Sequence, residues 1–324
     1  MAVGVALAFI QAAAFTKAPP AKLSPIKGDA LALGLDFGTS GVRCAVVDAA
    51  GAIIVQPSGY SWGDRERCQS AEDWERALEA QLDAVPPSAR ARIQRIAVSG
   101  TSSSMLLVDA AGGAPAPNRP GPRMYDFSVT KQASGGSGEA ALELLRAHTP
   151  EGHTVRGATS ALAKLLAYHM EAPLRPAELL AHQSDFIASR LTRMVPTSDW
   201  HNALKLGYDV QTLSYPEWLT SGPIGQIVSH ALPPVVRPGE PIGPVSVELC
   251  TQWGLPEGCM VVGGTTDSIA AFLAAGAHEV GDAVTSLGST VAIKLLSSTF
   301  AADGSTGTYT RTGWAGPQVA GPSP

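Results

Sequence analysis

Residues 33–45 read LGLDFGTSGVRCA, and this stretch decides the fold. The apolar residues before Asp36 alternate as they do in a buried strand, and strand character returns over residues 42–47. Between them, residues 38–41 read GTSG, and two glycines so close together favour a tight reversal of the chain. The sequence therefore predicts a β-hairpin with two hydroxyl side chains at its tip.

The tip of this hairpin has the composition of a phosphate-binding turn. Backbone N–H groups in a glycine-containing turn can face an anion, and the hydroxyls of Thr39 and Ser40 add donors. Asp36, which precedes the turn, can hold a divalent cation against the same phosphates. The alternative is a structural turn in which Asp36 caps backbone amides. The stretch matches neither the Walker pattern GxxxxGK[ST] nor GxGxxG.

A second informative stretch, residues 261–275, reads VVGGTTDSIAAFLAA. It predicts a strand that runs through two glycines and leads to Asp267 at the start of an apolar helix. The positive end of the helix dipole stabilises a carboxylate there, and the glycines leave room for a substrate, as a catalytic base requires. The alternative is that Thr266 or Asp267 is only the helix N-cap. Another turn of glycine and hydroxyl residues, SLGST, follows between two strands at residues 286–290.

Between these stretches the sequence indicates further strands and helices. Ser70 is the predicted N-cap of an amphipathic helix that a Pro-Pro pair ends. Residues 93–98 predict a strand that enters the polar loop 99–104, SGTSSS, and loops at strand ends are where α/β proteins bind ligands. Residues 134–138, SGGSG, have the composition of a flexible linker.

Length, charge and cysteine usage exclude several classes of function. The 324 residues exceed what a single hydrophobic core usually supports, so we expect either two lobes or one domain and part of another. A formal net charge of -5 without a basic cluster argues against a nucleic-acid partner. The four cysteines have no CxxC spacing, which argues against zinc and thioredoxin-like chemistry and fits a reducing compartment.

The first 28 residues are rich in alanine, contain three lysines and contain no acidic residue. This composition predicts a targeting extension, and its apolar start is too short to span a membrane. A plastid transit peptide is favoured, so we expect the protein in the chloroplast stroma. The alternatives are a secretory signal and a protein of the cytoplasm.

The separated motifs over residues 31–296, taken in order, resemble the FGGY family of carbohydrate kinases, which belongs to the actin-like ATPase superfamily. Within the family the resemblance is to the plant and cyanobacterial xylulose-kinase-like proteins, which include a D-ribulose kinase. It implies an α/β fold: an actin-like ATPase (ribonuclease H-like) lobe with a mixed sheet and flanking helices, and a second lobe that is only partly present. The implied domains are the targeting extension (1–28), an N-terminal sugar-binding lobe (29–270) and the truncated start of a nucleotide-binding lobe (271–324).

The resemblance also implies roles for single residues. Asp267 matches the family's catalytic aspartate and would be the general base. The phosphates of ATP would be bound by Asp36, Gly38, Thr39, Ser40, Arg43, Gly288, Ser289 and Thr290, with Asp36 also as the Mg²⁺ ligand. The sugar would be bound by Thr39, Ser40, Ser102, Ser103, Asp126 and Asp267.

The implied reaction transfers a phosphoryl group from ATP, with Mg²⁺ as cofactor, to a terminal hydroxyl of a small-molecule ketopentose, D-ribulose or D-xylulose. One alternative is a catalytically inactive sugar-binding or regulatory protein, which the short second lobe favours. The other is an actin-like ATPase without a sugar substrate, which would leave Asp126 and the 99–104 loop without a role. Neither nucleic acid nor a membrane is an expected partner, and the sequence does not define the oligomeric state.

Two aromatic side chains near these motifs have alternative interpretations. Trp62 is expected to pack in the core, and the alternative is that it stacks on a sugar face. His201 lies in residues 197–203, which predict a capped turn. We expect an ordinary polar residue there and not a metal ligand, because no second ligand has suitable spacing.

Overall fold

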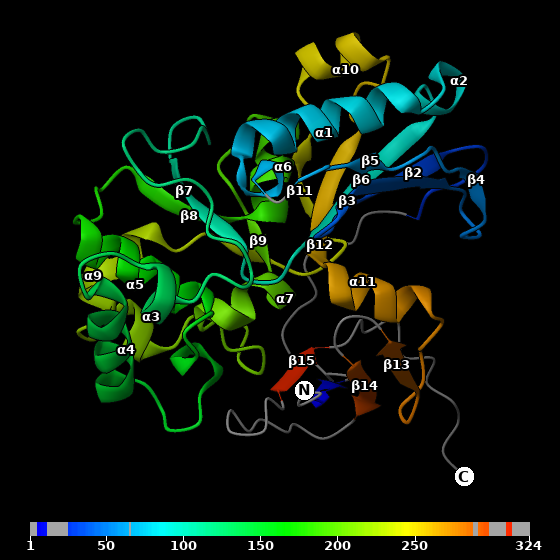
Figure 1. Ribbon diagram of the computed structural model, residues 1–324. Helices are drawn as coiled ribbons and strands as arrows, with labels where there is room; N and C mark the ends of the chain where they lie inside the picture. Colours follow the sequence, from blue (N-terminus) through cyan, green and yellow to red (C-terminus); the bar gives the residue numbers. More distant parts are fainter. Residues whose placement is uncertain (1–4, 12–24, 65, 288–290, 298–308, 313–324) are drawn as a thin grey trace.

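The computed structural model describes residues 5–11, 25–64, 66–287, 291–297 and 309–312, and its centre is one large mixed β-sheet (Figure 1). In spatial order the strands of this sheet are β11 (Pro241–Pro244), β12 (Met260–Thr266), β6 (Ile93–Gly100), β2 (Leu31–Phe37), β3 (Gly41–Val47) and β4 (Ile53–Val55), and β5 (Tyr60–Ser61) also pairs with β3. Strands β2, β6 and β12 are parallel, whereas the remaining pairs are antiparallel. The predicted α/β fold with a mixed sheet is confirmed.

The predicted hairpin is formed by β2 and β3. Phe37 and Val42 face each other across the last rung of the antiparallel pair. Along β2 the buried side chains alternate with more accessible ones, so Leu35 and Phe37 enter the core while Asp36 lies on the opposite face. This alternation follows from the two-residue period of a strand. It places the carboxylate of Asp36 on the open face of the sheet.

Helices cover the other face of the sheet. Figure 1 shows α1 (Ala71–Ala84) and α10 (Val247–Trp253) above the strands. The hydroxyl of Ser70 accepts a hydrogen bond from the backbone N–H of Asp73 at 3.2 Å, so the predicted N-cap of α1 is confirmed. Trp74 on α1 is fully buried against α6 (Gln183–Thr192), which contacts β6 and β12. On the opposite side of the sheet, α11 (Asp267–Ala274) contacts β12 and β6.

A second hydrophobic core lies beside the sheet, around α4 (Ser137–His148), α5 (Ala161–Glu171) and α9 (Gly225–Val228) (Figure 1). The antiparallel ribbon of β7 (Met105–Asp109) and β8 (Glu178–His182) separates the two cores. Met105 and Leu107 belong to the helical core, whereas Leu106 and Val108 belong to the core under the sheet. The ribbon therefore buries both of its faces.

The prediction of a flexible linker at residues 134–138 is wrong for its last two residues, whereas residues 134–136 form an exposed turn. Ser137 and Gly138 form the buried first turn of α4. A Cβ atom at Gly138 would lie 1.9 Å from the carbonyl oxygen of Val129 in α3 (Val129–Gln132), so this glycine permits close packing of two helices. Composition alone cannot distinguish a glycine that gives flexibility from one that gives space.

A separate four-stranded sheet contains β13 (Ala283–Leu287), β14 (Val291–Ser297), β1 (Val5–Gln11) and β15 (Tyr309–Thr312). Strands β13 and β14 are antiparallel, as expected for the strands that flank the SLGST turn. Strand β1 comes from the segment predicted to be a targeting extension and pairs in parallel with β14. That assignment stays a prediction, and so do the proposed domain limits.

The remaining elements are short. They are α2 (Pro87–Arg90), α7 (Trp200–Ala203), α8 (Glu217–Thr220), β9 (Ser198–Asp199), β10 (Val235–Val236), and 3-10 helices at Arg67–Gln69, Thr154–Arg156, Leu204–Leu206 and Ser229–Ala231. Among the described residues, none of the helices has both the length and the apolar character needed to cross a bilayer.

Candidate functional site

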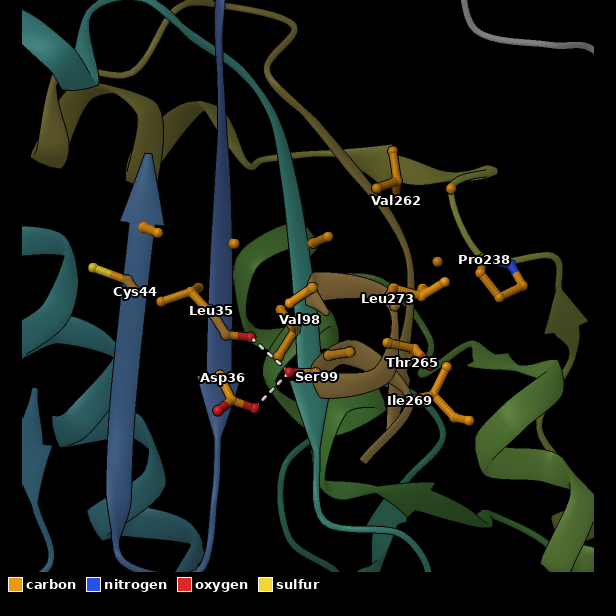
Figure 2. Close-up of a pocket in the computed structure, with 18 of the residues that line it drawn as sticks. Leu35, Asp36, Cys44, Val98, Ser99, Pro238, Val262, Thr265, Ile269 and Leu273 are labelled. Carbon is orange, nitrogen blue, oxygen red and sulfur yellow. Dashed lines mark hydrogen bonds between the residues drawn. The ribbon is translucent and has the colours of Figure 1, made fainter. Parts of the chain in front are cut away.

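The strand register brings three separated motifs together at one edge of the sheet. Asp36 on β2 lies opposite Ser99 on β6, and Ser99 lies opposite Thr265 on β12. The hydroxyl of Ser99 donates to Asp36 Oδ1 at 2.7 Å and approaches the carbonyl oxygen of Leu35 at 3.4 Å (Figure 2). Because these strands are parallel, their carboxyl ends share one edge, which is where open α/β sheets bind ligands.

The buried indole ring of Trp62 supports the predicted phosphate turn through a hydrogen bond. Trp62 Nε1 donates to the carbonyl oxygen of Gly38 at 3.0 Å. The backbone N–H of Gly38 donates to the carbonyl oxygen of Gly41, also at 3.0 Å. A Cβ atom at Gly41 would lie 2.1 Å from the carbonyl oxygen of Tyr60, so β5 can approach this turn only beside a glycine. Trp62 is 2% exposed, which confirms the packing interpretation. The side chains of Thr39 and Ser40 remain exposed at the tip.

The Asp36 carboxylate has a cationic neighbour across the hairpin. Arg43 Nη1 lies 3.9 Å from Asp36 Oδ2, and Arg43 Nη2 donates to the hydroxyl of Ser40 at 3.4 Å. The side chains of Arg43 and Asp36 are 62% and 39% exposed, so both are accessible to a ligand. The guanidinium therefore supplies positive charge next to the turn.

The donor set fits a metal ion that arrives with a nucleotide. Among the residues that the structure describes, no three His, Cys, Asp or Glu side chains are grouped so that they could hold a metal ion. Mg²⁺ in phosphoryl-transfer sites is commonly held by one or two carboxylates together with phosphate oxygens and water. Asp36, as an accessible carboxylate beside the turn, matches that requirement.

Asp267 occupies the first position of α11, directly after β12. The N-cap residue is Thr266, whose side chain makes no capping hydrogen bond, and Asp267 Oδ1 accepts from the backbone N–H of Ser268 at 2.6 Å. The half-buried carboxylate thus lies at the positive end of the helix, where the dipole stabilises its negative charge. The strand, the helix and the acid between them are as predicted.

The glycines before Asp267 have a structural role in addition to the predicted one, which stays a prediction. The β12–β6 register shifts between Val262 and Thr265, so that Gly263 and Gly264 form a β-bulge. A Cβ atom at Gly264 would lie 1.8 Å from the carbonyl oxygen of Val98. A Cβ atom at Gly263 would lie 2.5 Å from the carbonyl oxygen of Arg237. Neighbouring backbone thus fills the position of a Cβ atom at both glycines, which also line the larger cavity described below.

A histidine that the sequence did not mark as functional braces the end of β12. His201 Nδ1 lies 2.7 Å from the hydroxyl of Thr265, and the ring is 3% exposed. It belongs to α7, whose first turn is capped by Asp199 as predicted: Asp199 Oδ1 accepts from the N–H groups of His201 at 2.8 Å and Asn202 at 3.2 Å. No local pattern could have found this contact, because the two residues are far apart in the sequence.

The loop at residues 99–104 and the segment that carries Asp126 are joined by hydrogen bonds. The backbone N–H of Tyr125 donates to the hydroxyl of Ser104 at 2.8 Å. Ser102 is half-buried, whereas Ser103 is fully buried and has φ of 67°. In this structure Ser103 contributes its carbonyl oxygen to internal contacts, and Ser102 is the more accessible serine of the predicted pair.

Two cavities receive part of the predicted residues, whereas Asp267, Ser102 and Ser103 are not among the described residues that line these two cavities. The first, of about 480 Å³, lies between the open face of the sheet and α11, and its polar end is formed by Asp36, Arg43, Ser99 and Thr265 (Figure 2). The second, of about 420 Å³, is lined by Thr39 and Ser40 from the turn together with Tyr125 and Asp126. The structure therefore brings Asp126 to the first motif. Gly288, Ser289 and Thr290 lie outside the described residues.

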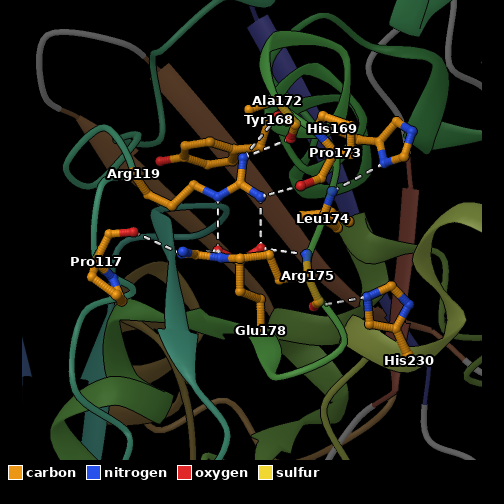
Figure 3. A network of polar contacts seen from close by, with 10 residues as sticks. All are labelled: Pro117, Arg119, Tyr168, His169, Ala172, Pro173, Leu174, Arg175, Glu178 and His230. Carbon is orange, nitrogen blue, oxygen red and sulfur yellow. Dashed lines mark hydrogen bonds and ion pairs between the residues drawn. The ribbon is translucent and has the colours of Figure 1, made fainter.

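A buried ion-pair network fixes the chain that leads to Asp126. The guanidinium of Arg119 faces the Glu178 carboxylate with N–O distances of 2.8 and 2.6 Å, and Arg175 contacts the same carboxylate at 2.6 Å (Figure 3). Burial acts to raise the pKa of Glu178, but the hydrogen bonds from Arg119 and Arg175 outweigh it and lower the pKa to about 2. Glu178 is thus an ionised anchor at neutral pH.

Solved structures of sugar kinases share this fold. Xylulose kinase from Rhodospirillum rubrum superposes with a TM-score of 0.62 and 22% identity over 80% of this chain and 53% of its own. Gluconate kinase from Lactobacillus acidophilus gives 0.60 and 16%, covering 82% of this chain and 54% of its own. Plasmodium falciparum glycerol kinase with ADP gives 0.58 and 13%, covering 81% and 53%. No family model matches the chain.

At these identities the similarity establishes the fold. The chain spans about half the length of these kinases. Over that length it shares the α/β fold of these sugar kinases, a mixed sheet with flanking helices.

Proposed function

We propose that this chain, with its sugar-kinase fold, serves the ATP-dependent phosphorylation of a ketopentose, D-ribulose or D-xylulose, at a terminal hydroxyl. The observation that carries the proposal is the row formed by Asp36, Ser99 and Thr265 across the carboxyl ends of three parallel strands, with Asp267 two residues beyond. A carboxylate for a metal ion and a carboxylate for a proton are both needed for phosphoryl transfer to a hydroxyl.

In the proposed reaction the sugar hydroxyl oxygen forms a bond to the γ-phosphorus of ATP, and the bond to the β,γ-bridging oxygen breaks. The hydroxyl proton passes to Asp267, and ADP leaves. Mg²⁺ bound with the nucleotide would offset phosphate charge, and Asp36 would hold it. Arg43 and the backbone N–H groups of the turn add positive charge on the same side. Thr39, Ser40 and Asp126, which line one cavity, would orient the acceptor, and Ser102 would assist them.

Two observations support a nucleotide as the phosphoryl donor. The turn at Gly38 to Gly41 presents exposed hydroxyls beside a guanidinium, and a kinase of the same fold was solved with ADP. Gly288, Ser289 and Thr290 would complete the phosphate contacts. Because this chain spans about half of the similar kinases, the activity of the whole protein is part of the proposal.

A second candidate is a sugar-binding or regulatory protein without turnover. It is favoured by the cavity that Thr39, Ser40 and Asp126 line, because that cavity is seen among the described residues, whereas the second phosphate turn is not among them. Binding and turnover must therefore be measured separately.

The test is ADP release by the 324-residue chain with Mg²⁺-ATP and either D-ribulose or D-xylulose, beside calorimetric sugar binding. Asp267→Asn keeps the shape of the side chain but cannot accept the proton. We expect turnover to fall by about 10² to 10⁴-fold while the dissociation constant of the sugar stays within about twofold.

Ser268→Ala, at the next position, is the matched control and should keep turnover near the wild-type value. Equal losses of binding and turnover in Asp267→Asn would refute its role as a base. Sugar binding without ADP release in the wild-type chain would establish the second candidate, and absence of both would refute the proposal.

A further inference from the structure

Lys164 is a fully buried lysine in the first half of α5. Its ammonium donates to the carbonyl oxygen of Ser103 at 2.8 Å and to that of Met124 at 2.6 Å. A buried ammonium is tolerated only when it is well paired, since its desolvation is costly. The two carbonyl groups are therefore the reason why the charge can lie here.

The two carbonyl groups belong to the two segments that form the acceptor side of the site. Ser103 directly follows Ser102 in the loop after β6, and Met124 lies two residues before Asp126. Measured along the chain, Lys164 is 61 residues from Ser103 and 40 from Met124. One side chain thus links a loop and a segment that are distant in sequence.

The same face of α5 makes further contacts to the second segment. The Tyr168 hydroxyl donates to the carbonyl oxygen of Gly121 at 2.7 Å, and the guanidinium of Arg123 lies 3.7 Å from the centre of the Tyr168 ring. Arg123 also pairs with Glu171. Spacings of four and three residues place Lys164, Tyr168 and Glu171 on one helical face. Of these three, Lys164 is the residue that also contacts the loop.

The backbone of the loop depends on this contact. Ser103 is one of few non-glycine residues with a positive φ, at 67°, a conformation that L-residues adopt only when the surroundings hold it. Its carbonyl oxygen would lose a buried hydrogen bond if the ammonium were removed, and a buried carbonyl without a partner is costly. The ammonium therefore stabilises the turn that presents Ser102.

Resting on the function proposed above, we propose that Lys164 is a positioning residue of the acceptor site, which sets the distance between Ser102 and Asp126 without touching the sugar. Other charged groups act on it. Burial lowers the pKa of Lys164 to about 7, the positive charges of Lys205 and Arg123 act in the same direction, and Asp126 opposes them. Substrate affinity should therefore decrease as pH rises through about 7, because the neutral amine makes weaker hydrogen bonds to the two carbonyl groups.

The test is Lys164→Met, which keeps the length of the side chain and removes the ammonium. We expect the dissociation constant of the ketopentose, measured by calorimetry, to rise about tenfold, equivalent to about 1.4 kcal/mol. The pH dependence with a midpoint near 7 should disappear in this variant. Lys131→Met, at an exposed lysine of α3, is the matched control and should bind as the wild type does.

Hydrogen exchange gives a readout that needs no sugar. The amides of Ser104 and Tyr125 should exchange faster in Lys164→Met, while that of Ile96 in β6 should not change. Unchanged exchange at both amides, or unchanged affinity and pH profile, would overturn the inference. Failure of the wild-type chain to bind either sugar would refute the proposed function instead, and the exchange data would still decide whether Lys164 holds the loop.

A measurement on the wild-type chain covers the case in which Lys164→Met does not fold. The ¹³Cε resonance of Lys164 should titrate with a midpoint near 7, and the midpoint should move when ketopentose is added, because the charge of Asp126 acts to raise the pKa of Lys164. A midpoint that the bound sugar leaves unchanged would also overturn the inference.

Discussion

Carboxylates in this chain have either a functional or a structural role, depending on how deeply each one is buried. Asp36 and Asp267 lie at the accessible edge of the sheet, where a ligand can reach them. Glu178 is 3% exposed and is surrounded by the guanidinium groups of Arg119 and Arg175, so it can only be structural. The same functional group therefore serves proposed chemistry in one place and packing in another, and burial separates the two.

Replacing Glu178 tests the structural task. Glu178→Gln leaves the buried guanidinium of Arg119 without its countercharge, so we expect the free energy of unfolding at pH 7 to fall by about 3 kcal/mol in urea denaturation. Glu72→Gln is the control, because the Glu72–Arg76 pair on the surface of α1 has side chains 75% and 51% exposed. It should change stability by less than about 1 kcal/mol.

The effect of Glu178 should depend on pH with a defined sign. The native pKa of Glu178, about 2, lies below the ordinary value of 4.5, so the folded state favours the ionised form. Its stabilisation is complete above about 4.5 and is lost as pH falls towards about 2. The stability difference between wild type and Glu178→Gln should therefore shrink over this range, and a constant difference would contradict the assignment.

At the level of elements, the β-bulge in β12 determines the position of Asp267, the candidate base. Two residues of β12, Gly263 and Gly264, lie opposite the single residue Val98 of β6. The extra residue shifts the end of the strand before it enters α11. The position of Asp267 thus depends on how closely two neighbouring backbones approach.

Gly264→Ala tests that close approach. The added Cβ atom would lie 1.8 Å from the carbonyl oxygen of Val98, so backbone must move, and we expect the free energy of unfolding to fall by about 3 kcal/mol. Gly34 on β2 lines the same cavity as Gly264, the one of about 480 Å³. In the control variant Gly34→Ala, the added Cβ atom would be 3.9 Å from the nearest atom, the carbonyl oxygen of Ala45. It should be nearly neutral in thermal denaturation. Similar losses in both variants would contradict the packing argument.

Local sequence predicted the elements around Asp36 and Asp267 because each of these motifs is continuous. Alternation of apolar residues, a turn with two glycines and an acid at a helix start can all be read within fifteen residues. The contacts made by Lys164 and His201 could not be predicted, since each joins residues that are at least 40 positions apart. The role of Gly138 in close packing was missed for a different reason: Val129 is near in sequence, but composition does not show that it lies in a separate helix that packs against α4.

At the scale of the whole molecule, the described chain has no exposed thiol. Cys44, Cys68, Cys250 and Cys259 are all free and buried. Burial raises the pKa of Cys44 to about 11 and that of Cys259 to about 12, and it also raises the pKa of Cys250. The reactive thiolate is therefore scarce in the folded protein at neutral pH.

Thiol labelling should report global unfolding. With Ellman's reagent at pH 8, we expect slow reaction of the native chain and rapid reaction of all four cysteines in guanidinium chloride. Labelling of the native chain should speed up in parallel with the loss of helical circular dichroism along a denaturant series. Rapid reaction of a cysteine before that transition would show that its core opens locally.

The ribbon of β7 and β8 has a consequence for cooperativity. Met105 and Leu107 belong to one core, while Leu106 and Val108 belong to the other. Unfolding of the ribbon would therefore remove buried side chains from both cores. The two cores form one cooperative unit, in which local opening on one side removes stability from the other. The 99–104 loop lies directly before the ribbon. A ligand that orders the loop would therefore stabilise both halves of the molecule at once.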